Sequence, residues 1–271
     1  MNLAILALLL AVACSAVMTA AWRVAVSTGK TGWIDVVWTF GVGLTGAVAA
    51  VAPIAGASSY LPRQVLVAIL VAAWSLRLGS HIAARTLKNG DDPRYRKFIK
   101  EWGDDWRGQL FRFLQIQAAV MLLLALSVMA AAHNPSDALR LQDWLGVAIL
   151  GAAVVGEGIA DRQLARFAAN PANKGKVCDA GLWSWSRHPN YFFEWLGWVA
   201  YPVIAIDLTG SYWWGLVALV APAMMYWLLA HVSGVPPLEE HMLKSRGDAF
   251  RAYQRRVSAF FPAPPKTQEQ R

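Results

Sequence analysis

The sequence predicts an all-α integral membrane protein, a bundle of seven transmembrane helices. Hydrophobic residues make up 56% of the chain and charged residues only 15%, whereas a soluble domain carries roughly a quarter charged residues. The apolar residues gather in runs long enough to cross a bilayer, which takes about 20 residues as a helix. The Lys and Arg residues cluster in alternate loops between these runs, the charge pattern of a polytopic membrane protein.

The apolar runs give the seven helices in order. No Lys or Arg precedes the first run, so it lacks the basic start of a signal peptide. The fifth run is about 39 Å long as a helix, longer than a bilayer core, and we expect its C-terminal end to project into water. The polar loop after the third run contains an amphipathic stretch that indicates a helix lying on the membrane surface. The predicted helices span about residues 2–22, 33–54, 61–83, 110–132, 144–169, 189–206 and 212–231.

A polar tail, residues 232–271, completes the chain. Leu243, Phe250, Tyr253 and Val257 recur at helical spacing, which predicts a helix that docks by one apolar stripe and ends at Pro262. The chain has no internal repeat and no low-complexity linker. We therefore expect one transmembrane domain, residues 1–271, with this tail in the cytoplasm.

The placement of charge predicts the topology. The net charge is +8, but the basic residues lie in alternate loops, which argues against nucleic acid as a partner. The loops after runs one, three and five and the tail hold two, eight, five and seven Lys or Arg residues, if Arg112 at the start of the fourth run and Arg162 and Arg166 at the end of the fifth are counted with them. The other two loops hold Arg63 and Arg140. The positive-inside rule then puts the N-terminus outside and the C-terminus in the cytoplasm.

The densest group of chemically active side chains is the stretch Gly181 to Glu194, GLWSWSRHPNYFFE, at the cytoplasmic start of the sixth run. Pro189 suits the first turn of a helix and Ser186 suits its cap. Asn190 and Glu194 are four residues apart and share a face, and polar residues at that depth need partners.

Phosphate binding is a natural use of this stretch. A helix N-terminus offers free N–H groups and partial positive charge, and Arg187 and His188 stand directly before it. Tyr191 shares a helix face with Arg187. The alternative interpretation is a basic anchor next to the membrane.

The end of the fifth run carries a second polar group. Glu157 and Asp161 lie one helical turn apart on one face. Two interpretations stay open: the carboxylates pair with Arg77 or Arg187, or they accept hydrogen bonds from ribose hydroxyls and an amide. Further basic and amide side chains that can reach a phosphate follow in the sequence. They are Arg162, Asn170 and Lys174.

Asp35 and Arg77 are the ionisable residues deepest in the second and third runs. They either pair with each other or lie at the inner end of a substrate cavity, because intramembrane charges are functional candidates. In the polar loop, Arg94 or Tyr95 is a candidate cover for a cofactor. In the tail, Glu239 is a candidate for the cytoplasmic opening. The sequence has neither metal-ligand spacing nor a glycine-rich nucleotide loop, and we expect no metal site.

GLWSWSRHPNYFFE, together with Glu239 and a tail helix rich in Tyr and Phe that leads to Phe-Pro, resembles the steroid 5α-reductase family. The resemblance is closest to its bacterial branch with the pattern RHPNYxxE and covers roughly residues 33–262. Membrane methyltransferases of the isoprenylcysteine type carry a similar RHPxY block but usually lack the Asn. The resemblance implies a seven-helix bundle in a bacterial inner membrane that holds NADPH in its cytoplasmic half and reduces the carbon–carbon double bond of an enone lipid.

The resemblance also implies roles for single residues. Asn190, Tyr191 and Glu194 match family residues that contact the cofactor, and Asp161 matches an aspartate of the fifth helix. The expected cofactor-binding residues are Glu157, Asp161, Arg162, Asn170, Lys174, Arg187, His188, Asn190, Tyr191, Glu194 and Glu239. The expected catalytic residues are Asp35, Arg77 and Tyr191.

Asp35 lies near the second-helix glutamate with which the family binds substrate. Vertebrate members pair that glutamate with a third-helix tyrosine as the acid at the steroid ketone. The third run here contains no tyrosine, and Trp74 lies near that place. The resemblance therefore leaves the proton donor unassigned.

The sequence thus predicts an NADPH-dependent oxidoreductase that acts on a lipophilic enone, typically a 3-oxo-Δ4-steroid, taken from the membrane lipid. NADPH is expected over NADH because the cytoplasmic loops supply basic residues for a 2′-phosphate and no acid follows a glycine-rich turn to hold a free ribose. Two alternatives stay open. One is a membrane methyltransferase that uses S-adenosylmethionine, and the other is a membrane protein without catalytic activity.

Overall fold

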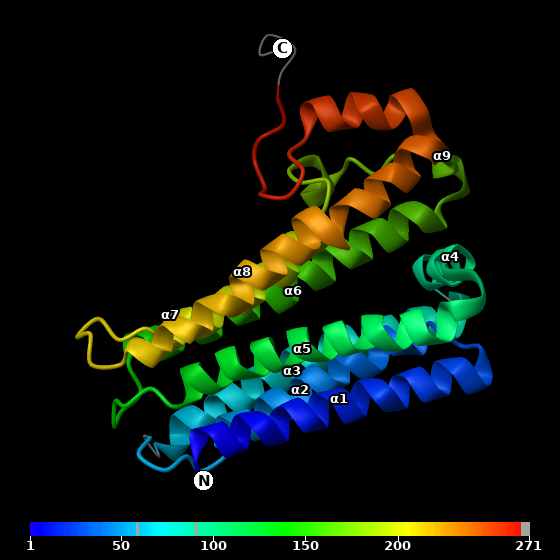
Figure 1. Ribbon diagram of the computed structural model, residues 1–271. Helices are drawn as coiled ribbons and strands as arrows, with labels where there is room; N and C mark the ends of the chain where they lie inside the picture. Colours follow the sequence, from blue (N-terminus) through cyan, green and yellow to red (C-terminus); the bar gives the residue numbers. More distant parts are fainter. Residues whose placement is uncertain (58–59, 90–91, 267–271) are drawn as a thin grey trace. The chain divides into compact units, whose positions relative to one another are not determined.

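The computed structural model describes residues 1–57, 60–89 and 92–266, and the elements in these ranges are helices joined by loops (Figure 1). Within them the structure has no strand, and the β-type contact is an isolated bridge between Ser186 and Ser258. The prediction of an all-α protein is confirmed. The α-helices are α1 (Leu3–Thr28), α2 (Trp33–Val51), α3 (Leu61–Asn89), α4 (Pro93–Trp102), α5 (Trp106–Ala132), α6 (Leu141–Ala169), α7 (Pro189–Ala205), α8 (Val220–Trp227) and α9 (Val235–Arg256).

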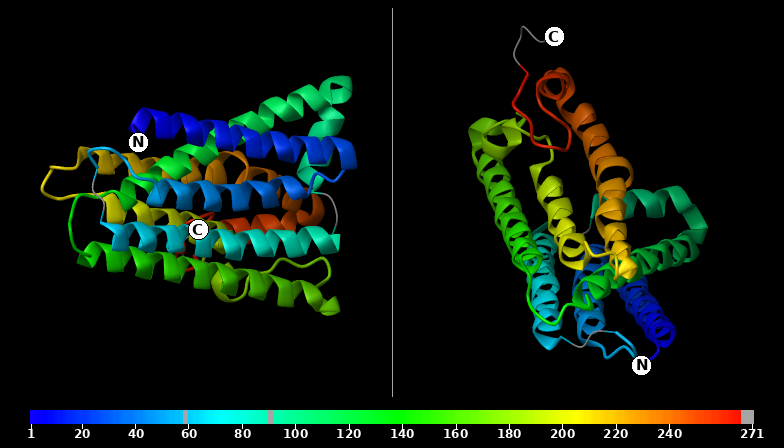
Figure 2. Two further views of the ribbon diagram at one scale, coloured as in Figure 1. Left: turned by 90° about the horizontal axis from the view of Figure 1, so that it is seen from below. Right: turned by 90° about the vertical axis from the view of Figure 1, so that its left-hand side faces the viewer.

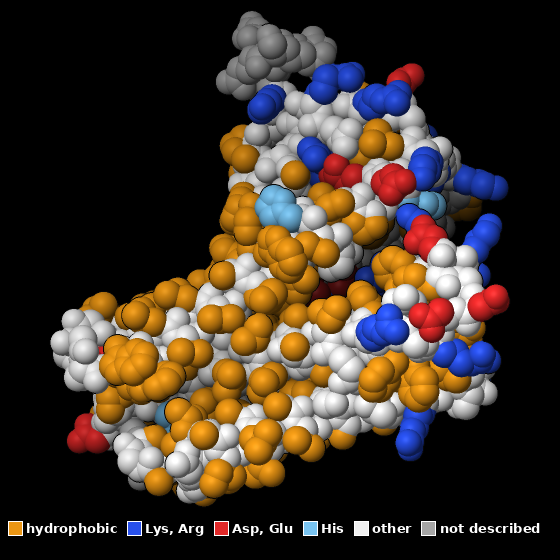
Figure 3. All heavy atoms as spheres, in the orientation of Figure 1, with side chains coloured by type: hydrophobic (Ala, Val, Ile, Leu, Met, Phe, Trp, Pro, Cys, Tyr) orange, Lys and Arg blue, Asp and Glu red, His pale blue; other side chains and the backbone are white. Residues whose placement is uncertain are grey.

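Six helical stretches among the described residues are long and apolar enough to cross a membrane. They are Leu3–Thr28, Trp33–Val51, Leu61–Lys88, Arg94–Ala132, Leu141–Ala169 and Trp213–Arg256. The sixth predicted crossing corresponds to α7, which has 17 residues with Pro202 inside it and is shorter than these stretches. Large hydrophobic side chains such as Leu8, Val12 and Ile116 are more than half exposed, as expected for helices that face lipid (Figure 3).

The predicted boundaries agree with the helices to within a few residues at most ends. The seventh run differs from the prediction because it is not one regular α-helix. It begins as a 3-10 helix, Trp213–Leu219, continues as α8, and passes through a π-helical turn, Leu228–Val232, before α9. The amphipathic loop stretch forms α4, as predicted. Asp92 caps it by accepting from the amide of Arg94 at 2.8 Å. Asp91, which belongs to the same stretch, lies outside the described residues.

The chain forms two compact units. Unit 1 comprises residues 1–146 and 201–221, and unit 2 comprises residues 147–200 and 222–271. In unit 1, α1, α2, α3 and α5 run side by side (Figures 1 and 2). A Cβ at Gly43 of α2 would stand 2.2 Å from the hydroxyl of Ser75, so the small residue allows α2 and α3 to approach closely.

A buried ion pair in unit 1 joins the start of α3 to the start of α6 and to the loop that precedes α6. Arg63 and Asp143 are fully buried and lie 2.9 Å apart. The guanidinium of Arg63 also donates to the carbonyls of Asn134 and Ser136. These bonds satisfy the buried charges. Removal of one partner would leave the other charge buried and uncompensated, which is strongly destabilising.

Unit 2 is built on the contact between α6 and α7. Gly156 of α6 faces the ring of Phe193, where a Cβ would stand 2.4 Å from a ring carbon. The indole N–H of Trp183 donates to the carbonyl of Ala160 at 3.0 Å and fixes the turn that precedes α7 on the side of α6. This contact brings the polar residues near the end of α6 next to those at the start of α7.

The tail docks as predicted but follows a different path. Phe250, Tyr253 and Val257 are buried together and pack with Val177 of the loop after α6. The tail helix α9 ends at Arg256, so the prediction that Pro262 ends it is wrong. The cause is the residue after the helix: Val257 is extended, and Ser258 then accepts from the amide of Arg187 at 2.8 Å. The sequence predicted one domain. The two compact units do not test this expectation, which stays a prediction.

Candidate functional site

The turn before α7 is held by Ser186, which is fully buried. Its hydroxyl oxygen accepts from the amide of His188 at 3.1 Å, and the hydroxyl donates to the carbonyl of Phe260 at 2.8 Å. The amide of Phe192 donates to the carbonyl of His188, which begins the helical bonding of α7. Ser186 therefore fixes the helix start, as the sequence suggested, and also fixes the tail.

Arg187, His188 and Glu239 meet in one cluster. Arg187 donates to both carboxylate oxygens of Glu239, at 2.7 and 3.3 Å, and its Nη1 donates to the carbonyls of Gln254 and Val257. Nε2 of His188 lies 3.0 Å from Glu239. The sequence placed all three residues at the cofactor but gave no sign that they bond to one another across more than 50 positions.

Only one ring nitrogen of His188, Nε2, has a hydrogen-bond partner among the described residues. The side chain is 3% exposed, and its Nδ1 is a buried atom without a hydrogen-bond partner among the described residues. The ring stacks on Tyr191 with centroids 5.6 Å apart and an interplanar angle of 8°. A buried polar atom without a partner is costly, so a donor or acceptor from a ligand would be stabilised there.

Asp161 and Asn190 meet where α6 contacts α7, and Glu157 and Glu194 each lie one helical turn from one of them. Nδ2 of Asn190 donates to Asp161 across the two helices at 3.4 Å. Glu157 and Glu194 are 5% and 6% exposed, which requires hydrogen bonds for each. Oε1 of Glu194 accepts from the indole N–H of Trp198 at 3.1 Å. The sequence missed Trp198, although its position four residues after Glu194 was a readable signal.

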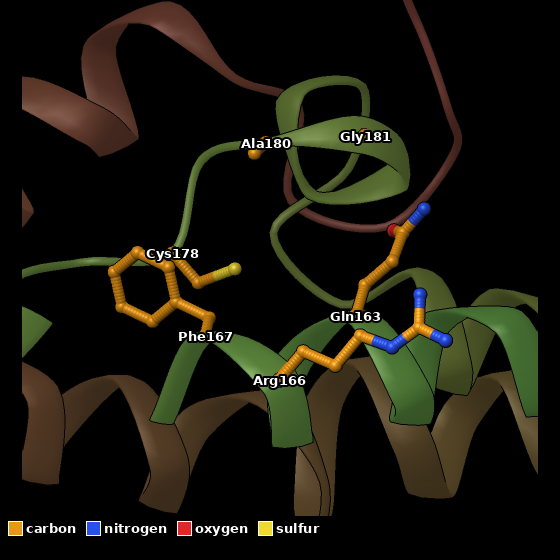
Figure 4. A pocket seen from close by; sticks show the side chains of 6 residues that line it. All are labelled: Gln163, Arg166, Phe167, Cys178, Ala180 and Gly181. Carbon is orange, nitrogen blue, oxygen red and sulfur yellow. The ribbon is translucent and has the colours of Figure 1, made fainter. Parts of the chain in front are cut away.

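Two hollows adjoin the C-terminal end of α6. The smaller, about 280 Å³, lies between α6 and the segment that carries Cys178 and Gly181 (Figure 4). Phe167 and Cys178 line both hollows. The larger, about 460 Å³, is lined by the predicted phosphate residues Asn170 and Lys174, and also by side chains that the sequence did not single out. Arg162 lies nearby on α6 and is exposed.

The catalytic candidates of unit 1 lie on α2 and α3. Asp35 accepts from the hydroxyl of Tyr95 at 2.8 Å and forms an ion pair with Arg94, and Nε2 of Gln117 donates to the same hydroxyl. Tyr95 is 3% exposed. Arg77 lies half-buried on α3. The third run contains no tyrosine, and the tyrosine that contacts Asp35 comes from α4.

Within the described part of the chain, no group of three or more His, Cys, Asp or Glu side chains is placed to hold a metal ion. Both cysteines are free and buried. Burial raises the pKa of the Cys178 thiol, a hydrogen bond with the backbone of Ala180 lowers it, and the charge of Asp179 raises it, so that the pKa lies above its usual value.

Comparison with known protein families gives a match over residues 21–257, to the family described as "Protein of unknown function (DUF1295)". The chain belongs to this family. An uncharacterized protein of Schizosaccharomyces pombe is 25% identical over 224 residues. The aligned region covers 74% of this chain and 63% of the yeast protein, so the chain spans less than two thirds of that relative. No solved structure matches the chain.

Proposed function

We propose that this protein is an integral membrane reductase that uses NADPH to reduce the carbon–carbon double bond of a lipophilic enone, such as a 3-oxo-Δ4-steroid. The observation that carries the proposal is one side of α6 in unit 2, which leads from two carboxylates to the basic hollow. Glu157, Asp161, Leu164 and Ala168 recur at helical spacing and form one line along that helix. The line begins at Glu157 and passes the pair of Asp161 with Asn190. It ends at Leu164 and Ala168, which line the basic hollow.

The residues along this line fit a dinucleotide at both ends. From Glu157 to Ala168 the helix rises about 17 Å, a length that suits an extended dinucleotide. At one end, the carboxylates and Asn190 offer acceptors and donors for an amide and ribose hydroxyls. At the other end, Lys174 and its basic neighbours suit phosphates. Nδ1 of His188 adds a buried position that a ligand can satisfy.

NADPH would supply the hydride for the β-carbon of the enone. The protein then has to stabilise the negative charge that builds on the ketone oxygen, which needs a hydrogen-bond donor aimed at that oxygen. We assign this donor to Tyr95, whose single hydroxyl proton is donated to Asp35 in the structure and would turn to the ketone oxygen when an enone binds. The geometry resembles the acid pair of the family that the sequence resembles, with the tyrosine contributed by α4 in place of the third helix.

The proposal includes the topology. Seven crossings, with α7 as the sixth, place the N-terminus outside and the start of α7 on the cytoplasmic side. The basic residues around the hollow then face the compartment that contains NADPH. In a bacterium the membrane concerned would be the inner membrane.

The test is cofactor identity followed by turnover. Protein purified in a neutral detergent is denatured, and its retained small molecules are identified by mass spectrometry. NADPH or NADP⁺ is expected, and absorbance at 340 nm should then fall only when progesterone, a 3-oxo-Δ4-steroid, is added with NADPH. Retention of S-adenosylmethionine together with methyl transfer would replace the reductase with the methyltransferase. Neither cofactor retained or turned over would support the non-catalytic alternative.

A further inference from the structure

The larger hollow of unit 2 is lined by three cations and by no carboxylate. Lys174 and Lys176 come from the loop after α6, and Arg246 comes from α9, with Asn170 and Asn173 beside them. Among the residues that the structure describes, no carboxylate lies within ion-pair distance of these three cations. A concave surface lined by charge of one sign concentrates ligands of the opposite sign.

Arg246 is the side chain most clearly prepared for a ligand. Its Nε is buried and has no hydrogen-bond partner within the described residues. Its Nη1 donates to the carbonyl of the adjacent Ser245 at 3.3 Å. A guanidinium presents donors in a fixed fork that matches phosphate, and a buried donor without a partner costs free energy until an acceptor arrives.

A kink in α9 holds Arg246 at the hollow. Gly247, directly after it, has φ of +52° and ψ of −123° and breaks the helix into two parts. Met242 before the kink and Phe250 after it both pack in the cluster that includes Val177. The loop that carries Lys174 and Lys176 is therefore held by both parts of α9.

The loop itself is also fixed by hydrogen bonds. The amide of Lys174 donates to the carbonyl of Pro171 at 3.1 Å, and the amide of Lys176 donates to the carbonyl of Asn173 at 2.9 Å. The side chain of Asn173 donates to the carbonyl of Phe167 at 3.0 Å and ties the loop to α6. The cations thus project from a preorganised frame, which reduces the entropic cost of binding.

We propose that Arg246, Lys174 and Lys176 form a binding site for a phosphate monoester. Two ligands carry this chemistry: the 2′-phosphate of NADPH and the headgroup of phosphatidic acid. NADPH as the ligand rests on the proposed function. The existence of a phosphate site does not depend on that function. With NADPH as the source, Arg246 is the residue that distinguishes NADPH from NADH.

The experiment measures binding to the full-length protein in a neutral detergent by isothermal titration calorimetry. The probe is adenosine 2′-monophosphate, and adenosine is its matched control without the phosphate. Arg246→Gln is compared with Arg251→Gln, an exposed arginine of α9 beyond the kink that pairs with Asp248. Lys176→Gln tests the loop side independently, and thermal unfolding checks that each variant is folded.

The parent protein is expected to bind adenosine 2′-monophosphate more tightly than adenosine. Loss of one charged hydrogen-bond partner should weaken that binding about 10- to 100-fold in Arg246→Gln and in Lys176→Gln. Arg251→Gln should bind like the parent. The proposal is overturned if Arg246→Gln and Lys176→Gln bind the nucleotide as the parent does, or if the parent binds neither this nucleotide nor phosphatidic acid.

Further measurements separate the site from the proposed function. Binding to nanodiscs of phosphatidylcholine with phosphatidic acid, lost in Arg246→Gln while the nucleotide does not bind, supports the site and identifies a lipid source. Nucleotide binding that depends on Arg246, without any reduction of an enone, supports the site and contradicts the reductase. Turnover with an unchanged preference for NADPH in Arg246→Gln supports the reductase and contradicts the 2′-phosphate of NADPH as the ligand of this site.

Discussion

Asn190 and Glu194 share one face at the start of α7, and each contributes a polar group that a cofactor can use. Asn190→Ala and Glu194→Gln should each raise the NADPH dissociation constant by about one to two decades, since a buried group left without its partner costs about 1–3 kcal/mol. Asp35→Asn should instead raise the Michaelis constant of the enone. Fluorescence titration with NADPH and steady-state kinetics separate these effects.

The control for these variants is Glu101→Gln, an exposed carboxylate on α4 that pairs with Lys97. It should leave both constants unchanged, because an exposed ion pair contributes little. If Asn190→Ala and Glu194→Gln bind NADPH as the parent does, and a methyl-donor cofactor binds in its place, the reductase assignment fails.

Tyr95 is the residue to which we assign the hydrogen bond at the ketone. Tyr95→Phe keeps the ring packed against Phe98 and Phe113 and removes only the hydroxyl on Asp35. The turnover number should fall about 10²- to 10³-fold, as when one donor to a developing oxyanion is lost, while NADPH binding stays constant. Tyr226→Phe, in the aromatic cluster of the tail, is the matched control. A Tyr95→Phe enzyme with the parent's turnover would show that another group donates the hydrogen bond to the ketone oxygen.

The reactivity of the Cys178 thiol tests whether its pKa is raised by burial. Because burial raises its pKa, a smaller fraction of the thiol is ionised at pH 7 than in a free cysteine, and the thiolate is the reactive form. In a Cys14→Ser background, N-ethylmaleimide should modify Cys178 more slowly than free cysteine at pH 7. The rate should rise as the pH increases toward the raised pKa. A rate equal to that of free cysteine at pH 7 would show that the thiol is exposed and ordinary.

At the scale of elements, Gly247 controls the path of α9. Its backbone conformation is accessible to glycine and strained for other residues, and a Cβ there would meet no atom within 4 Å. Gly247→Ala should therefore destabilise the protein through backbone strain alone, by about 1–3 kcal/mol, and lower its thermal midpoint. Gly151→Ala, in the regular part of α6 with equally open space, should raise the midpoint slightly or leave it unchanged. Equal midpoints for Gly247→Ala and the parent would contradict the strain.

Helix positions followed from sequence because hydrophobic runs and helix breakers are local signals. Pro189 lies at the start of α7, where the local rule for helix starts places it. The pairs Arg187 with Glu239 and Asp35 with Tyr95 were not predictable. Each depends on the register between elements 52 and 60 residues apart, which no local pattern encodes. Arg246 was missed for the same reason, since its role appears only once the kink brings it to the loop after α6.

For the whole molecule, the remaining property to test is orientation in the membrane. The two basic residues of the less charged loops, Arg63 and Arg140, both form ion pairs within the protein. Arg63 is fully buried against Asp143, and Arg140 lies 3.6 Å from the same carboxylate. The cations that remain accessible therefore belong to the other loops, which strengthens the charge asymmetry behind the predicted topology.

We therefore predict that the C-terminus is cytoplasmic. Alkaline phosphatase, which is active only in the periplasm, should be inactive when fused after Arg271, whereas a green fluorescent protein fusion there should fluoresce. The matched control is the same phosphatase inserted after Thr209, in the turn between α7 and the helix that follows, which should be active. The positive charge of the tail and of the loop after α6 must otherwise cross the membrane against the potential, at about 2.3 kcal/mol per charge for each 100 mV. An active fusion after Arg271 together with an inactive one after Thr209 would invert the topology and remove the basic hollow from the compartment that supplies NADPH.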